Sequence, residues 1–77
     1  MNKARRKSIQ DVAGQLETLK STLEEIQCEE EEYRDNIPGN LQGSARYEAA
    51  DEACDALGEA VEGLEDIITS LGDLSEG

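Results

Sequence analysis

The residues best suited to bind a ligand surround the single Pro-Gly pair of the chain. They are Tyr33, Arg34, Asn40, Gln42, Ser44, Arg46 and Tyr47. Phenol rings can stack on a nucleobase, and guanidinium groups can pair with phosphate. The same side chains are also suited to closing the end of a helical bundle with salt bridges. The pattern therefore leaves two alternatives, a nucleotide-binding pocket and a structural plug.

A second candidate site lies at the amino end of the chain. Lys3, Arg5, Arg6 and Lys7 are four of the seven basic residues. If the chain forms an oligomer, copies of this cluster can converge and bind an anion. As a sign of nucleic-acid binding the cluster is weak, because the chain behind it is strongly acidic.

The residue types needed for most catalysis and metal binding are missing. The chain has no histidine, which is the usual proton shuttle and a frequent metal ligand. Cys28 and Cys54 are too few for a zinc site. The consecutive acids Glu29–Glu32 point around a helix axis and do not converge on one ion. We therefore expect no enzyme activity, no metal site and no cofactor.

Two heptad runs, apolar except at Glu30 and spaced alternately three and four apart, must position these candidates. The first run is Ile9, Val12, Leu16, Leu19, Leu23, Ile26, Glu30 and Tyr33. The second is Tyr47, Ala50, Cys54, Leu57, Val61, Leu64, Ile68 and Leu71. This spacing keeps one stripe of a helix facing a partner helix. It predicts an all-α fold, an antiparallel helical hairpin with both runs in the seam.

The predicted boundaries make residues 1–77 a single domain, with helices over about 2–35 and 45–74. Within the connecting turn, 36–44, the sequence Ile37-Pro38-Gly39-Asn40 predicts a type II turn, with glycine at positive φ. Ser44 is the expected N-cap of the second helix. We expect Leu41 to pack onto the end of the bundle.

The second helix should also contact another copy of the chain. Beside its seam it carries a further apolar row, Ala53, Ala60, Ile67 and Leu74, so its apolar stripe is the wider one. The single core of a chain of this size rarely supplies more than ~3–5 kcal/mol of stability. These features predict a homo-oligomeric bundle.

Three seam details follow from the same register. Cys54 should be buried, whereas Cys28 should face water, so we expect no disulfide between them. Glu30 occupies a seam position, where a polar residue commonly fixes the pairing of helices. Alternatively, Glu30 contributes to a polar pocket near the turn.

The charge of the chain limits the kinds of partner it can bind. Nineteen acids against seven basic residues give a net charge of −12. Such a surface repels nucleic acid and anionic membranes. Residues 1–8 lack an apolar stretch, so we expect no signal peptide and a cytoplasmic protein. No segment has the ~18 apolar residues of a membrane span.

Two segments carry a resemblance. The start MNKARRK and the stretch NIPGNLQGSARYEAADEACDALGEA resemble small helical proteins encoded by phages and prophages of Firmicutes. The resemblance implies a phage origin and a host bacterial cytoplasm. It assigns no chemistry to any residue.

The combined expectation is a non-enzymatic phage accessory protein that assembles with itself and acts against host defence. The first hypothesis is that it sequesters a nucleotide immune signal, with Tyr33, Arg34, Arg46 and Tyr47 supplying stacking and charge. The alternative is an acidic inhibitor that binds a host defence protein, including by DNA mimicry. A structural or regulatory phage component is a third interpretation.

Overall fold

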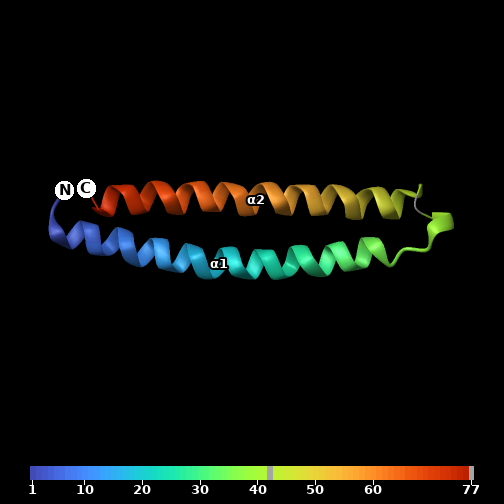
Figure 1. Ribbon diagram of the computed structural model, residues 1–77, viewed down its shortest axis with the longest axis horizontal. Helices are drawn as coiled ribbons and strands as arrows, with labels where there is room; N and C mark the ends of the chain where they lie inside the picture. The colour runs from blue at the N-terminus through green and yellow to red at the C-terminus, as the bar shows by residue number, and fades with distance from the viewer. Residues whose placement is uncertain (42, 77) are drawn as a thin grey trace.

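The chain forms a helical hairpin. The computed structural model describes residues 1–41 and 43–76, which contain helices α1 (Lys3–Asp35) and α2 (Ala45–Glu76) and the short 3₁₀ helix η1 (Gly39–Leu41). The two long helices lie side by side and antiparallel, with both termini at one end and the turn at the other (Figure 1). The molecule measures 59 × 14 × 13 Å. The described residues contain no strand, so the all-α hairpin predicted from the sequence is confirmed.

Both long helices begin at a side chain that caps free backbone amides. The Arg5 backbone N–H donates to Asn2 Oδ1 at 2.8 Å, so α1 begins at Lys3, one residue later than expected. The Tyr47 N–H donates to Ser44 Oγ at 3.3 Å, which confirms the predicted N-cap of α2. Each cap satisfies a donor that has no partner within the helix. Helix α2 continues to Glu76, two residues beyond its expected end.

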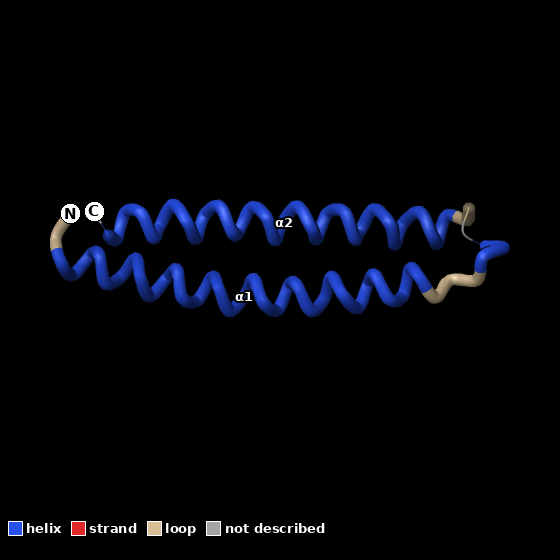
Figure 2. The backbone as a smooth tube through the Cα atoms, in the orientation of Figure 1, coloured by secondary structure: helices blue, strands red, loops and turns tan. Residues whose placement is uncertain are grey.

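The predicted type II turn is wrong. No residue in the described part of the chain has a positive φ, including Gly39. The backbone instead winds into η1, where the Leu41 N–H donates to the Pro38 carbonyl at 2.8 Å (Figure 2). The fixed φ of proline is compatible with the first turn of a 3₁₀ helix, so glycine need not reverse the chain.

The end of the hairpin is also closed by a different residue from the one predicted. Leu41 is 43 % exposed, whereas Ile37 is 4 % exposed. Ile37 lies seven residues after Glu30 and continues the row that faces α2. This row keeps its direction through the last turn of α1, which explains why Ile37 packs inward.

The seam of α2 agrees with the heptad prediction. Ala50 and Cys54 are buried, and the other six predicted seam residues are half-buried. Cys28 is exposed and Cys54 is buried, and both are free thiols, as predicted. The register assigned to α2 is therefore confirmed.

The seam predicted for α1 is only half right. Ile9, Leu16, Leu23 and Glu30 are half-buried against α2. The other predicted row is exposed: Val12 is 47 %, Leu19 57 %, Ile26 43 % and Tyr33 43 % accessible. In its place Ala13, Lys20, Gln27 and Arg34 are half-buried. The helix is rolled about its axis relative to the prediction.

The roll is explained by contacts along one side of the seam. Lys20 pairs with Glu65, and Arg34 Nη1 donates to Asp51 Oδ1 at 2.9 Å. Long basic side chains can cover apolar surface with their stems while their charged ends reach a carboxylate. The hydrogen bond to Glu65 raises the pKa of Lys20. We call this side the polar flank, defined by Lys20, Gln27 and Arg34 of α1 with Asp51, Gly58 and Glu65 of α2.

The opposite side carries the residues that the roll leaves uncovered. Arg46 contacts Tyr33, which shows that the row of Tyr33 on α1 and the row of Arg46 on α2 share this side. At intervals of seven, these rows give Val12, Leu19, Ile26 and Tyr33 on α1 and Ala60, Ile67 and Leu74 on α2. We call these seven residues the apolar flank. Ile67 and Leu74 are 50 % and 52 % exposed.

The hydrophobic core of the hairpin is thin. Ile37, Ala50 and Cys54 are the buried apolar residues of the described chain, and all three lie in the half nearer the turn. None of the larger side chains in residues 1–41 and 43–76 is fully buried. Burial of apolar surface is the main favourable term in folding, so a single hairpin leaves much of it unused.

Candidate functional site

The turn end of the hairpin brings Tyr33 and Arg46 together. Tyr33 lies in the last turns of α1 and Arg46 in the first turn of α2. Arg46 Nε donates to the Tyr33 hydroxyl at 2.6 Å, and the guanidinium carbon lies 5.4 Å from the ring centroid. Both residues are exposed. The pair therefore presents an aromatic ring and a positive charge to solvent, the combination that stacks on and pairs with a nucleotide.

Arg34 lies on the other side of the seam and already has two partners. Its Nη1 donates to Asp51 at 2.9 Å and its Nε to Asp35 at 3.1 Å. These two carboxylates, Asp35 first, raise the pKa of the guanidinium. The charge of Arg34 is thus compensated within the chain, and its side chain links α1 to α2 in the manner of a structural plug.

The remaining predicted residues of the turn do not join the Tyr33–Arg46 pair in a common pocket. Tyr47 is half-buried in the seam row of α2. Asn40 is exposed in η1, and Ser44 is used as the N-cap. Gln42 lies outside the described residues. The set predicted from the sequence is thereby divided between an exposed pair, a salt-bridged arginine and a seam tyrosine.

Two residues that matter here were not predicted. Asp51 anchors Arg34, and Ile37 closes the hairpin beneath the turn. A signal existed for each. Ile37 continues the row of Leu16, Leu23 and Glu30 at steps of seven. Asp51 lies seven residues before Gly58 in the row that also contains Glu65, so both acids face the same basic row of α1.

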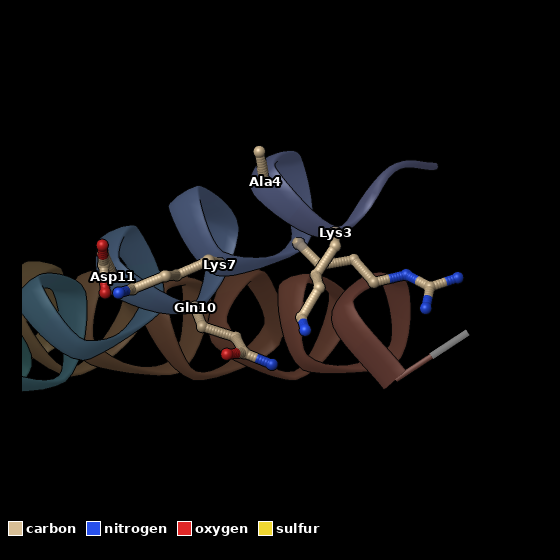
Figure 3. Close-up of a pocket in the computed structure, with 6 residues that line it drawn as sticks. Lys3, Ala4, Lys7, Gln10 and Asp11 are labelled. Atoms are coloured by element: carbon tan, nitrogen blue, oxygen red, sulfur yellow. The ribbon is translucent and has the colours of Figure 1, made fainter.

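The basic amino end contains a surface hollow. Lys3, Arg6 and Lys7 line a cavity of ≈ 730 Å³ together with Ala4, Gln10 and Asp11 (Figure 3). Lys3 extends toward α2, whereas Ala4 points away from it (Figure 3). Arg5 belongs to the predicted cluster but does not line the hollow. Asp11 adds a negative charge to the rim, which weakens the hollow as an anion site.

Glu30 and Cys54, the two seam residues that could take part in chemistry, are both packed between the helices. Glu30 is half-buried at its seam position. Burial raises the pKa of the Cys54 thiol, while the nearby positive charge of Arg34 acts in the opposite direction. A thiol with a raised pKa forms less thiolate and is a poor nucleophile. Cys54 therefore behaves as a small core residue.

Neither a cluster of metal-binding side chains nor a membrane-spanning helix is present among the described residues. Residues 1–41 and 43–76 contain no group of three His, Cys, Asp or Glu side chains that could hold a metal ion. Within the same residues, neither long helix is apolar enough over a sufficient length to cross a membrane.

Comparison with known proteins adds no assignment to this geometry. No protein-family model, curated protein or solved structure matches the chain. The function must therefore be inferred from the surfaces of the hairpin: the exposed Tyr33–Arg46 pair, the apolar flank and the acidic outer faces.

Proposed function

We propose that this chain is a non-enzymatic phage accessory protein that assembles with itself into a helical bundle and binds a basic surface of a host protein. The observation that carries the proposal is a regular line of exposed carboxylates on α2. These are Glu52, Glu59, Asp66 and Asp73, spaced by seven residues, and Glu48, Asp55 and Glu62 beside them. Seven helical residues rise about 10.5 Å, so the line covers most of the length of α2.

The position of this line suits a binding surface. In an α-helix, positions seven apart point the same way, and the two acidic rows lie on neighbouring positions away from α1. The polar flank and the seam occupy the other sides of α2. The acidic face thus stays open whether or not a second copy covers the apolar flank.

The electrostatics favour a basic protein as the partner. A net charge of −12 on an elongated rod steers positively charged surfaces toward it and repels nucleic acid. A line of negative charge along a rod also shares with duplex DNA the sign of charge that DNA-binding proteins attract, although its charges are more widely spaced than phosphates. DNA mimicry, directed at a DNA-binding host protein, is the specific form of inhibition that this geometry supports.

Affinity capture from a lysate of a host bacterium tests the proposal. The wild-type chain should retain a basic host protein, and duplex DNA should compete with that retention. The variant Glu52→Lys/Glu59→Lys/Asp66→Lys should lose it. The control variant Glu17→Lys/Glu24→Lys/Glu25→Lys changes the net charge equally, but on exposed positions of α1. Retention by the α2 variant, or equal loss from both variants, would contradict a specific role of the α2 face.

A second candidate function is favoured by the Tyr33–Arg46 pair. An exposed ring and guanidinium at the turn support sequestration of a nucleotide immune signal. Two observations weigh against it. Arg34 is neutralised by Asp35 and Asp51, and Glu29–Glu32 lie on the same end of α1. An anionic ligand would therefore meet a largely negative surface.

Calorimetric titration with cyclic nucleotides and ADP-ribose derivatives distinguishes the two candidates. If the pair binds a nucleotide, Arg46→Ala should abolish the binding heat, while Tyr33→Phe should retain part of it because the ring remains. Tyr47→Phe, in the seam, should bind like the wild type. If no compound gives a binding heat, the nucleotides tested are excluded as ligands, and the acidic face of α2 remains the candidate binding surface.

A further inference from the structure

The apolar flank is the largest unexplained feature of the surface. Val12, Leu19 and Ile26 on α1 and Ile67 and Leu74 on α2 are between 43 % and 57 % exposed. From Val12 to Tyr33 the row on α1 extends for about 32 Å at ~1.5 Å per residue. A contiguous apolar patch on an otherwise acidic protein marks a contact surface.

The polar flank shows that this exposure is one-sided. There the two helices are joined by Lys20–Glu65 and Arg34–Asp51, and Gln27 fills the space above Gly58. A Cβ atom on Gly58 would lie 3.2 Å from Gln27 Nε2. One side of the hairpin is thus closed by polar contacts, and the other presents large apolar side chains at the seven-residue period typical of a helix that faces another helix.

We infer that a second copy of this chain covers the apolar flank, related by a two-fold axis perpendicular to the hairpin, so that the turns of the two copies lie at opposite ends. This inference rests on the self-association in the proposed function and specifies its surface and its helix order. The product is a four-helix bundle. Its interface is isologous, because each copy offers the same flank to the other.

The thin core of the hairpin favours a second copy as the occupant. The buried apolar residues of the described chain are Ile37, Ala50 and Cys54, two of which are small. Every copy therefore has the same deficit of buried apolar surface and the same exposed flank. Pairing two copies covers the flank and enlarges the core at once, whereas a transient partner would leave the apolar flank of the free chain in water.

The sizes of the side chains along α2 favour the antiparallel order. The α2 row that begins at Arg46 continues as the half-buried Ala53 and then Ala60, Ile67 and Leu74 of the apolar flank, so its small residues lie toward the turn and its large ones near the termini. Exchanging the ends seats the large residues of one copy in the gaps beside the small residues of the other, as in knobs-into-holes packing. With the turns at the same end, the two-fold axis would run along the rods and set α2 of one copy against α1 of the other, so the large and small residues of the two α2 rows would not interlock.

The distribution of charge favours the same order. Arg5 lies seven residues before Val12, so the row of the flank is basic at the terminal end. Glu29 lies beside this row near the turn end and is exposed. With the ends exchanged, Arg5 and Lys7 of one copy approach Glu29 and Glu32 of the other. With parallel copies, the two basic ends would repel each other, and so would the two acidic stretches.

This packing also locates the axis. Seating Ile67 and Leu74 beside the alanines of the other copy places the two-fold axis near Leu19. Leu19 of the two copies should then lie side by side. Leu74 of one copy should lie far from Leu74 of the other, because the two are near opposite ends of a rod 59 Å long.

Disulfide trapping combined with sedimentation tests the inference. In a Cys28→Ser background, which keeps the buried Cys54, Leu19→Cys should oxidise to a covalent dimer. Leu74→Cys and the background alone should remain uncrosslinked. Leu19→Asp should shift the sedimenting species from dimer toward monomer, whereas Ser21→Asp, on an exposed position of the same helix turn, should not.

The possible outcomes separate the two levels of the proposal. Crosslinking through both Leu19→Cys and Leu74→Cys would show parallel copies and overturn the helix order, while self-association stands. A dimer that crosslinks through neither would use another face and overturn the inference. A wild-type chain that sediments as a folded monomer would overturn both this inference and self-association. Binding of a host protein by the acidic α2 face is measured separately.

Discussion

Arg46 donates from Nε to the hydroxyl of Tyr33 at 2.6 Å, and this contact shows which row of α1 and which row of α2 lie on the same exposed side of the hairpin. It places the row that begins at Arg46 on α2 beside the row that ends at Tyr33 on α1. Since both rows are apolar between this pair and the basic amino end, the contact also marks where the apolar flank ends at the turn. The pair thus connects the candidate ligand site at the turn with the surface inferred to bind a second copy.

The buried contact at Ala50 provides a direct test of the seam. Ala50 is 2 % exposed, so Ala50→Leu should overpack the interface and lower the free energy of unfolding by about 1–3 kcal/mol. Ala49 is exposed on the preceding position. Ala49→Leu is the matched control and should change the stability little. Urea unfolding followed by circular dichroism measures both, and equal effects would mean that the seam lies elsewhere.

The glycines of the two helices should respond differently to alanine. A Cβ atom at Gly14 meets nothing within 4 Å, so Gly14→Ala should raise the free energy of unfolding by ~1 kcal/mol through helix propensity. At Gly58 the added atom lies 3.2 Å from Gln27 Nε2, and the Gln27 side chain must move. Gly58→Ala should therefore gain less. A larger gain at Gly58 than at Gly14, measured by thermal or urea unfolding, would contradict the close approach of the helices there.

The cysteines should differ in reactivity. In the native state at neutral pH, Cys28 should react rapidly with a thiol reagent and Cys54 slowly, because only Cys28 is exposed and burial raises the pKa of Cys54. In denaturant both should react at similar rates. Mass spectrometry of the labelled chain resolves the two sites. Rapid native labelling of Cys54 would mean that the α2 register is wrong.

The same thiol predicts a dependence of stability on pH. The pKa of Cys54 in the folded chain lies above its ordinary value of 9.0. The folded chain therefore keeps a proton that the unfolded chain releases. The contribution of Cys54 to stability is fully present below about pH 9 and is lost as the pH rises through the folded pKa. Urea unfolding from pH 7 to 10.5 should show this decline, and Cys54→Ala should reduce it.

The ion pair between Arg34 and Asp51 should contribute to hairpin stability in a salt-dependent way. Asp51→Asn removes a carboxylate that bridges the helices, whereas Asp35→Asn removes one from the same helix as Arg34. We expect the larger loss of stability from Asp51→Asn, and a smaller difference between the variants in 1 M salt because exposed charges are screened. Thermal unfolding at low and high salt measures this. Equal losses at low salt would show that the bridge does not hold the helices together.

Much of the fold was predictable because it follows from local pattern. The heptad spacing predicted two long helices to within two residues at each end, Pro38 determined where the first must end, and Ser44 supplied the cap of the second. The seam of α2 could be predicted because only one stripe of that helix combines Cys54 with large aliphatic residues. Its contrast between faces is strong enough to fix the orientation without knowledge of the partner.

The roll of α1 was decided by the tertiary structure. Its two apolar rows, ending at Glu30 and Tyr33, are nearly equivalent in sequence, so hydrophobicity alone assigns both to the seam. One partner helix can cover only part of that stripe. The ion pairs of Lys20 and Arg34 with α2 select which row turns inward. Lys20 and Arg34 are two heptads apart, as are Asp51 and Glu65, but the periodicity of one helix does not say which row of the other helix it faces.

The candidate site, like the fold, could be predicted from the sequence only in part. Sequence alone placed Tyr33, Arg34, Arg46 and Tyr47 at one end of the molecule, because a tight turn between two helices must bring its flanking residues together. Only the packed hairpin decided that Arg46 contacts Tyr33 while Arg34 is bound to Asp51 on the opposite flank. Proximity along the chain fixes the neighbourhood of a side chain, but the rotation of each helix about its axis fixes its partner.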